Sequence, residues 1–252
     1  MSRAGRALEA LAPYIERARS LSGWTFPGLV ARHLDAGPPW DYESAARGRA
    51  AGVRAALDMG TGGGEVLARV AADLPTRFVA TEEWVRNAPV ANRLLAPLGI
   101  DVVRTQSLSL PFRDSAFDLV LNRHEELEPS EVARVLSRSG TVLTQQVGPD
   151  NWPELDQFFP RRHDFGDLFA QYRDGFETAG LTLVSALQHR ERVAFGSLGD
   201  VVYMLLVAPW DIPGFDPEAD IEALLALEDA CGTADGVVLT ESRFLIEARK
   251  PS

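Results

Sequence analysis

An acidic residue followed by closely spaced glycines is the pattern in this sequence that most strongly suggests chemistry. In LDMGTGGGEV, residues 57–66, Asp58 precedes four glycines, and a second acid, Glu82, follows 24 residues later in FVATEEW. Glycines permit a tight turn and let a ligand approach the backbone, and the N-terminus of a following helix offers free N–H groups. Carboxylates beside such a turn suit a ligand that carries a cationic group or hydroxyl donors. We therefore expect a small-molecule site at this turn.

The spacing of the glycines argues against a dinucleotide ligand. The fingerprint GxGxxG would require its third glycine where this chain has Glu65, and a carboxylate there would repel a pyrophosphate. The chain instead has the order acid-x-GxGxG over residues 58–64. Glu82 ends the next predicted strand, where a carboxylate can accept hydrogen bonds from two ribose hydroxyls. The alternative is that Glu82 only complements the dipole of the helix that follows.

The elements that must position these residues alternate between strand and helix. Short apolar runs predict strands, and apolar residues at helical spacing predict the helices between them. The predicted strands are 53–59, 76–82, 100–106, 117–123 and 141–148, and the predicted helices are 65–74, 84–99 and 129–140. Such alternation implies parallel pairing through right-handed crossovers. The sequence therefore predicts an α/β fold with a doubly wound, Rossmann-like sheet and helices on both faces.

The remaining segments predict additions to this sheet. Residues 1–52 begin with an amphipathic helix and end in a small one, and we interpret them as an N-terminal helical cap. Residues 53–252 form the expected ligand-binding domain, with a helical insertion at about 197–239. Further helices are predicted at about 153–159 and 165–179, and long strands at 181–195 and 242–250.

Residues 53–147 resemble the class I S-adenosylmethionine (SAM)-dependent methyltransferases. The acid-x-GxGxG stretch resembles the first motif of that family, and Leu110-Pro111-Phe112 followed by Asp114-x-x-Phe117-Asp118 resembles a further block. SEVARVLSRSGTVLTQQVG, residues 130–148, is similar to the helix–glycine–strand block that comes next. The resemblance implies a seven-stranded sheet with an antiparallel last strand, SAM as cofactor, and methyl transfer as the activity.

The resemblance also assigns roles within the cofactor site. The acid before the glycine turn would help to hold the ammonium group of SAM, and Glu82, or Glu83 if the strand ends one residue later, would bind the ribose. Gln106 stands where the family usually has an aspartate that reads the adenine amino group; its carbonyl can accept the same hydrogen bond, and the Ser107 N–H can donate to a ring nitrogen. The residues expected to contact the cofactor are Asp58, Gly60, Thr61, Gly62, Gly64, Glu82, Glu83, Gln106, Ser107 and Asn122.

The segment LNRHEE, residues 121–126, is expected at the reaction centre, because ligands of doubly wound sheets lie beyond the carboxyl ends of the strands. Asn122 could touch the methionine end of the cofactor. His124 is the candidate general base, since its pKa lies near neutrality; the alternative is a loop histidine bonded to backbone or water. The segment lacks the Asn-Pro-Pro-aromatic tetrad of related enzymes that methylate exocyclic amines of bases or glutamine amides.

Aromatic and polar residues near the same sheet edge are candidates for contacts with the methyl acceptor, although each could be ordinary packing. As a group the aromatic side chains favour a flat or apolar substrate. Gln145 could orient a polar substrate, and His163 precedes an aspartate that could orient its ring. The candidates are Trp24, Trp40, Tyr42, Gln145, His163 and Trp210.

Composition and charge disfavour several other classes of function. The net charge of −11 gives poor attraction for nucleic acid, and the single cysteine, Cys231, rules out an intramolecular disulfide and a CxxC zinc site. No window reaches the roughly 18 apolar residues of a membrane span and no secretory signal is evident, so we expect a cytoplasmic protein without a membrane partner. The sequence thus predicts methyl transfer from SAM to an O, N or C nucleophile of a small molecule. The alternatives are an RNA base methyltransferase and a SAM-fold protein with a non-methylating activity.

Overall fold

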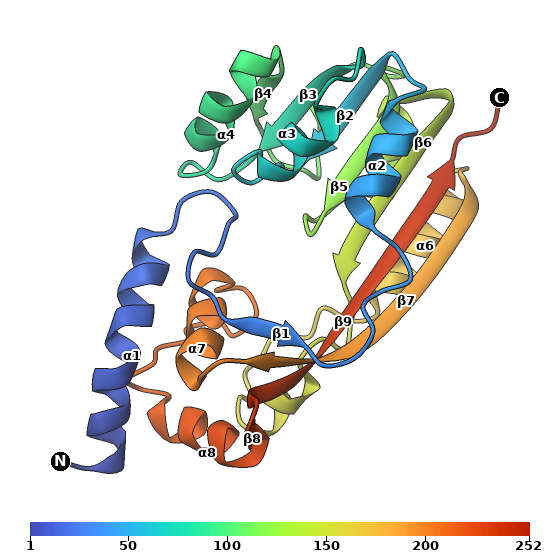
Figure 1. Ribbon diagram of the computed structural model, residues 1–252. Helices are drawn as coiled ribbons and strands as arrows, with labels where there is room; N and C mark the ends of the chain where they lie inside the picture. Colours follow the sequence, from blue (N-terminus) through green and yellow to red (C-terminus); the bar gives the residue numbers. More distant parts are fainter.

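A single mixed sheet runs through the molecule, and the computed structural model describes it together with all residues from 1 to 252 (Figure 1). Neighbouring strands follow the order β1-β7-β9-β6-β5-β2-β3-β4, and β8 pairs with β9. In chain order the strands are β1 Ala31–His33, β2 Ala55–Met59, β3 Arg77–Glu82, β4 Asp101–Arg104, β5 Phe117–Arg123, β6 Leu136–Val147, β7 Thr182–Phe195, β8 Gly232–Thr233 and β9 Gly236–Arg249.

The pairing confirms the predicted doubly wound sheet with an antiparallel last strand. Strands β4, β3, β2, β5 and β6 are parallel neighbours, whereas β9 is antiparallel to both β6 and β7. The sheet has nine strands where seven were expected, because the short strands β1 and β8 join it. All three residues of β1 are exposed, so no alternation of apolar residues marks that strand in the sequence.

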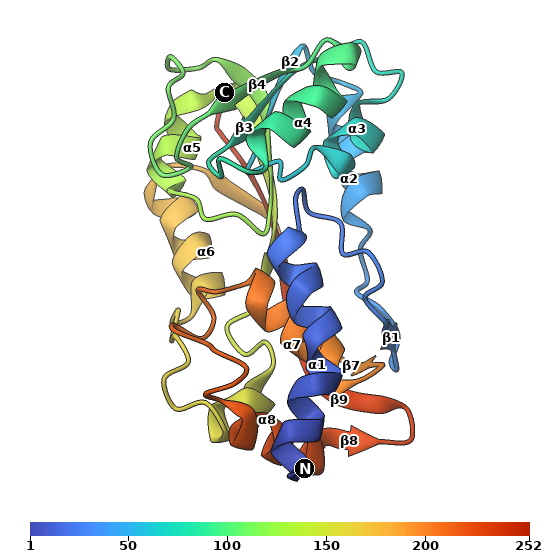
Figure 2. The same cartoon turned by 90° about the vertical axis from the view of Figure 1, so that its left-hand side faces the viewer.

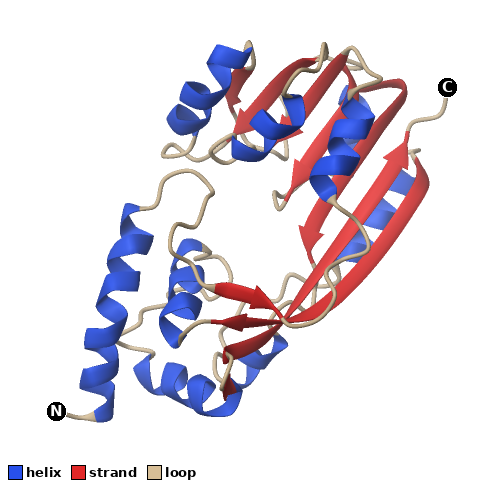
Figure 3. Cartoon of the chain, in the orientation of Figure 1, coloured by secondary structure: helices blue, strands red, loops and turns tan.

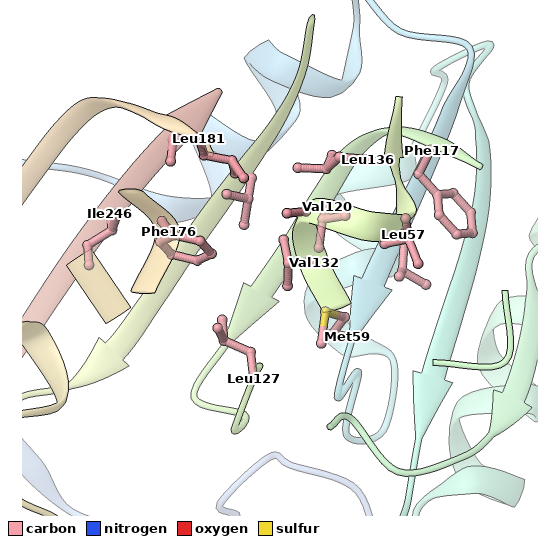
Figure 4. Close-up of a cluster of buried hydrophobic side chains, with 14 of the residues drawn as sticks. Leu57, Met59, Phe117, Val120, Leu127, Val132, Leu136, Phe176, Leu181 and Ile246 are labelled. Atoms are coloured by element: carbon pink, nitrogen blue, oxygen red, sulfur yellow. The ribbon is translucent and has the colours of Figure 1, made fainter. Parts of the chain in front are cut away.

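Helices cover both faces of the parallel part of the sheet (Figure 3). The α-helices are α1 Arg3–Ser20, α2 Tyr42–Ala50, α3 Glu65–Ala71, α4 Ala88–Leu95, α5 Pro129–Val135, α6 Leu168–Thr178, α7 Leu198–Val207 and α8 Ile221–Cys231, and the 3-10 helices are η1 Ala96–Leu98 and η2 Pro153–Gln157. Helices α2, α3 and α4 bury their apolar residues on one face. Helices α5 and α6 do so on the other, around Leu57, Val120 and Phe176 (Figure 4). None of the helices has the length and apolar character that crossing a membrane requires.

A second core lies around the outer halves of β7 and β9, which extend beyond the end of β6. Helices α1, α7 and α8 pack there (Figure 2) on buried residues such as Phe195 and Leu239. Leu11 of α1 and Val201 of α7 belong to the same cluster. The N-terminal helix and the insertion between β7 and β9 are therefore packed together, on the ribbon that continues the main sheet.

One predicted helix was too long. The segment 129–140 was expected to be helical to its end, but α5 stops at Val135 and β6 begins at Leu136. Lys250, near the end of the chain, donates from Nζ to the Ala133 and Leu136 carbonyls at 2.7 and 2.8 Å, and so satisfies the last turn of the helix. This contact spans more than 110 residues, so local sequence gave no sign of it.

Candidate cofactor and acceptor site

The turn between β2 and α3 has the left-handed backbone that its glycines allow. Gly60, Gly62 and Gly64 have φ angles of 64°, 62° and 87°, a region that costs other residues about 1–2 kcal/mol. The Thr61 N–H donates to the Thr81 carbonyl at 2.9 Å, and the Gly60 N–H donates to Thr81 Oγ1 at 3.3 Å. The turn is therefore fixed across the carboxyl ends of β2 and β3.

Side chains of the protein lie directly on this turn. A Cβ atom at Gly60 would collide with the Glu125 side chain, and one at Gly62 would come within 2.8 Å of Trp24 Cβ. The Trp24 N–H donates to Glu65 Oε1 at 3.3 Å. The glycines thus make room for the chain's own loops as well as for a ligand.

The two acids predicted from the motif end neighbouring strands and face the same side of the sheet, since Asp58 lies opposite Ala80, two residues before Glu82. Asp58 is 9% exposed and forms no ion pair, and burial raises its pKa to about 7. Glu82 accepts hydrogen bonds from the Gly62 N–H at 2.7 Å and the Trp84 N–H at 2.8 Å, and burial raises its pKa as well. Between them these strand ends hold two buried carboxyl groups without a cationic partner.

The neighbouring candidates for cofactor contact differ in exposure. Glu83 and Gln106 are exposed, and Ser107 is buried. The Ser107 hydroxyl donates to Glu125 Oε1 at 2.8 Å across the end of β2. Burial raises the pKa of Glu125 to about 7. Glu125 was not identified from the sequence, because an acid in a loop of three glutamates gives no local signal of burial.

Asn122 is fully buried at the end of β5 and supports the loop that follows. Its Oδ1 accepts hydrogen bonds from Thr144 Oγ1 at 2.8 Å and Gln146 Nε2 at 2.5 Å, and the same Gln146 nitrogen donates to the Glu125 carbonyl at 2.8 Å. Asn122 Nδ2 has no partner. The network therefore positions the 123–125 backbone and leaves one buried donor free.

His124 begins the loop beyond β5 with a φ angle of 61°. Its N–H donates to the Gln145 carbonyl at 2.8 Å, and its Nε2 lies 3.3 Å from Gln145 Nε2. Trp40 Nε1 donates to Gln145 Oε1 at 2.8 Å, so three of the predicted residues do meet. Burial, with the nearby Arg243 and Arg123 charges, holds the pKa of His124 well below 6.5, so the imidazole is neutral.

Three tryptophans from distant segments meet beside the glycine turn. Trp24 and Trp210 are stacked, with centroids 6.2 Å apart, and Trp84 is edge-on to both. The Gly23 N–H donates to Asn87 Oδ1 at 3.0 Å, which fastens the N-terminal segment to the loop after β3. We call Trp24, Trp84 and Trp210 the tryptophan cluster.

The two remaining acceptor candidates lie apart from each other. Tyr42 is buried at the start of α2, and its hydroxyl has no hydrogen-bond partner. His163 is exposed on the loop before α6, where its N–H donates to the Asp211 carbonyl. The Asp164 carboxylate accepts from the Gly166 N–H and makes no hydrogen bond to the His163 ring. The structure therefore places His163 beside the segment that carries Trp210, and its ring makes no hydrogen bond to another candidate.

The residues at this edge suit a cationic nucleoside such as SAM. Three buried polar atoms in this part of the structure have no hydrogen-bond partner: Tyr42 OH, Thr61 Oγ1 and Asn122 Nδ2. An unsatisfied buried polar atom costs about 1–3 kcal/mol, which a polar ligand would recover. The carboxyl groups of Asp58 and Glu82 carry the negative charge that an ammonium or sulfonium group would favour.

Comparison with known proteins identifies the central domain. Residues 57–144 match the model of a family described as a methyltransferase domain. No curated protein matches the chain. The matched residues contain the glycine turn, Glu82, the Leu-Pro-Phe block and the end of β5.

Solved structures share the fold at low sequence identity. A protein of Bacillus halodurans, described as a candidate methyltransferase, is 19% identical, with a TM-score of 0.63 over 83% of this chain and 99% of that one. The [4+2]-cyclase SpnF is 16% identical, with a TM-score of 0.58 over 98% and 95%. A geranyl diphosphate methyltransferase in complex with SAM is 14% identical, with a TM-score of 0.51 over 82% and 85%. The domain match and the shared fold agree with the resemblance seen in the motifs: residues 57–144 form a methyltransferase domain, within a fold that solved methyltransferase structures share.

Proposed function

We propose that this protein transfers a methyl group from SAM to an O, N or C nucleophile of a small molecule. The observation that carries the proposal is the pair of buried carboxyl groups, Asp58 and Glu82, at the ends of adjacent strands beside the glycine turn. Neither has a cationic partner in the protein. A cationic nucleoside would supply one.

Four residues of the cofactor site have a specific role in this proposal. Asp58 would accept a hydrogen bond from the ammonium group, and Glu82 would accept from the ribose hydroxyls while its own position is fixed by two backbone N–H donors. The Ser107 N–H and the Gln106 carbonyl would read the adenine edge. When bound, SAM supplies a methyl group on a cationic sulfur: the S–CH3 bond breaks as the bond to the acceptor forms, and its electron pair stays on sulfur. The protein's task is to align the acceptor and exclude water.

The outer segments would enclose this reaction. We propose that residues 1–52 act as a cap and that the insertion at about 197–239 closes the same side. The contacts of Trp24 with the glycine turn and with Trp210 support this arrangement. Both segments would hold water away from the sulfonium group.

Two residues of the loop after β5 could receive the acceptor proton. His124, the candidate from the sequence, is a neutral imidazole whose lowered pKa makes it a weak base. Glu125 has a pKa of about 7 and lies directly on the glycine turn. A base works best when its pKa is close to the working pH. Glu125 is therefore the stronger candidate where the nucleophile must lose a proton.

A non-methylating use of the same fold is the second candidate function. The structural match to the [4+2]-cyclase SpnF extends over 98% of this chain, including the N-terminal segment and the insertion. An RNA base methyltransferase is disfavoured by the net charge of −11 and the missing Asn-Pro-Pro-aromatic tetrad.

Calorimetry with SAM's demethylated product, S-adenosylhomocysteine (SAH), tests the cofactor site directly. Glu82→Gln should weaken SAH binding about ten- to a hundredfold, because charge-assisted hydrogen bonds contribute about 1.5–3 kcal/mol. β3 ends at Glu82, so the exposed Glu83 falls outside the strand-end position expected for the ribose ligand; Glu83→Gln is therefore the matched control and should bind as the wild type does. Transfer of labelled methyl groups to small molecules then separates methylation from a non-methylating activity. No heat with SAH in the wild-type protein would contradict the assignment.

A further inference from the structure

Arg123, the last residue of β5, is a half-buried arginine without a hydrogen-bond or ion-pair partner in the protein. Seven arginines are only partly exposed, and the other six each donate a hydrogen bond to a carbonyl or a carboxylate; these six are Arg17, Arg47, Arg134, Arg162, Arg173 and Arg243. Arg123 donates none and forms no ion pair. Shielding a cation without an anion is unfavourable, and burial accordingly lowers the pKa of Arg123. Its position therefore requires an explanation outside the protein's own contacts.

The acids nearest to Arg123 are not free to pair with it. Glu43 of α2 acts on it electrostatically, but both Glu43 oxygens accept hydrogen bonds from Arg69. Asp58 lies on the same face of the neighbouring strand, and the Arg123 charge acts to lower its pKa, but the two side chains form no ion pair or hydrogen bond. The anion that would match Arg123 is thus missing from the chain.

At the carboxyl edge of the sheet, the acidic and the basic side chains lie on different strands. Asp58 and Glu82 stand at the ends of β2 and β3. Arg123 of β5 lies opposite Gln145 of β6, which in turn lies opposite Leu245 of β9. Arg243 is two residues before Leu245 and therefore shares the face of Arg123. A cationic cofactor belongs at the acidic half. The other half, with its neutral His124 and Gln145, is left for the acceptor.

We propose that the methyl acceptor carries a carboxylate or a similar planar oxyanion, and that Arg123 binds it. This inference rests on the proposed function and narrows its substrate class. The planar guanidinium of arginine matches two oxygens of one anion at once. Trp40, fixed by its hydrogen bond to Gln145, adds an aromatic surface beside the same strand end.

The anion serves as an anchor for the acceptor. A carboxylate held by a guanidinium has its lone pairs engaged in hydrogen bonds, so it is a poor nucleophile. Arg123 would therefore fix the acceptor while another atom receives the methyl group. The product should keep its free carboxylate.

The test compares acids with their neutral amides. 4-Hydroxybenzoate and 4-hydroxybenzamide, glycine and glycinamide are titrated into the protein with and without SAH, and each is offered as acceptor of a labelled methyl group. Arg123→Gln removes the charge and Arg123→Lys keeps it without the planar fork. Arg113→Gln is the control, because Arg113 is exposed and also unpartnered.

In the wild-type protein an acid should bind about ten- to a hundredfold more tightly than its amide, since hydrogen bonds to charged groups contribute that much. Arg123→Gln should abolish the difference, Arg123→Lys should retain part of it, and Arg113→Gln all of it. SAH affinity should stay the same in every variant. Equal binding of acids and amides would overturn the proposal, and so would a loss of SAH affinity in Arg123→Gln, because Arg123 would then hold the carboxylate of the cofactor. If SAH does not bind the wild type at all, the proposed function fails, while titration of the acids without SAH still tests Arg123.

Discussion

Replacing Asp58 by Asn should separate the stability of the protein from its affinity for SAM. Burial raises the pKa of Asp58 from 3.8 to about 7. The folded protein therefore holds a proton that the unfolded chain has already released between about pH 4 and pH 7. The free energy of unfolding must fall as the pH rises through this window.

The size of the effect follows from the pKa. Each tenfold change in an equilibrium constant corresponds to about 1.4 kcal/mol, so ionising Asp58 in the folded, ligand-free protein costs about 4 kcal/mol at pH 8. Asp58→Asn removes this cost, and the variant should be more stable than the wild type at pH 8 and similar to it at about pH 4. SAM affinity should respond in the opposite sense, because an ammonium group requires the ionised carboxylate. At pH 6 about one-tenth of Asp58 is ionised, so wild-type affinity should be about tenfold lower than at pH 8.

Urea unfolding at several pH values and calorimetry with SAM measure the two effects. Calorimetry in buffers of different ionisation enthalpy should also detect one proton released on binding near pH 6. Glu125→Gln is the control, since it removes the other carboxyl group with a pKa of about 7 and leaves Asp58 in place. An Asp58→Asn protein that is less stable than the wild type at pH 8, or a wild-type affinity independent of pH between 6 and 8, would refute the reasoning.

Two further predictions concern the glycine turn between β2 and α3 and the residue that would take the proton from the methyl acceptor. Gly62→Ala should lower the free energy of unfolding in urea by about 1–3 kcal/mol, because the new methyl group meets a tryptophan at a φ angle of 62°, whereas Gly52→Ala has open space and should change little. If Glu125 is the base, Glu125→Gln should remove the ionisation near pH 7 from the pH profile of kcat at saturating SAM, where the bound ammonium group keeps Asp58 ionised, and His124→Asn, which tolerates the left-handed backbone, should keep it. The reverse result would make His124 the base.

The central fold could be predicted because the local pattern of apolar residues there agrees with the pairing between strands. β5 was predicted with its observed bounds, 117–123, since its apolar run ends in polar residues on both sides. The segment after Val135 was misassigned because its apolar spacing continues a helical pattern, whereas Leu136 is extended, with a ψ angle of 132°, and pairs with Phe117. Pairing between strands decides such cases, and it depends on residues far away in the chain.

The site was predictable to the extent that backbone motifs define it. Asp58 and Glu82 were identifiable because their positions follow from strand ends and glycine spacing. Arg123 and Glu125 were not, although they are neighbours of His124, because Arg123 is distinguished by a missing partner and Glu125 by a partly buried carboxyl group. Neither property can be read from residue type.

Glu65 affects both which ligand can bind at the start of α3 and how the N-terminal segment is held. Its carboxylate stands where a dinucleotide site would need glycine, so it disfavours a pyrophosphate at the start of α3. The same carboxylate accepts the Trp24 N–H and thereby holds the N-terminal segment on the glycine turn. A glycine here would remove both effects at once. In this chain, therefore, the residue that disfavours a dinucleotide also helps to hold the N-terminal segment, the proposed cap, on the glycine turn.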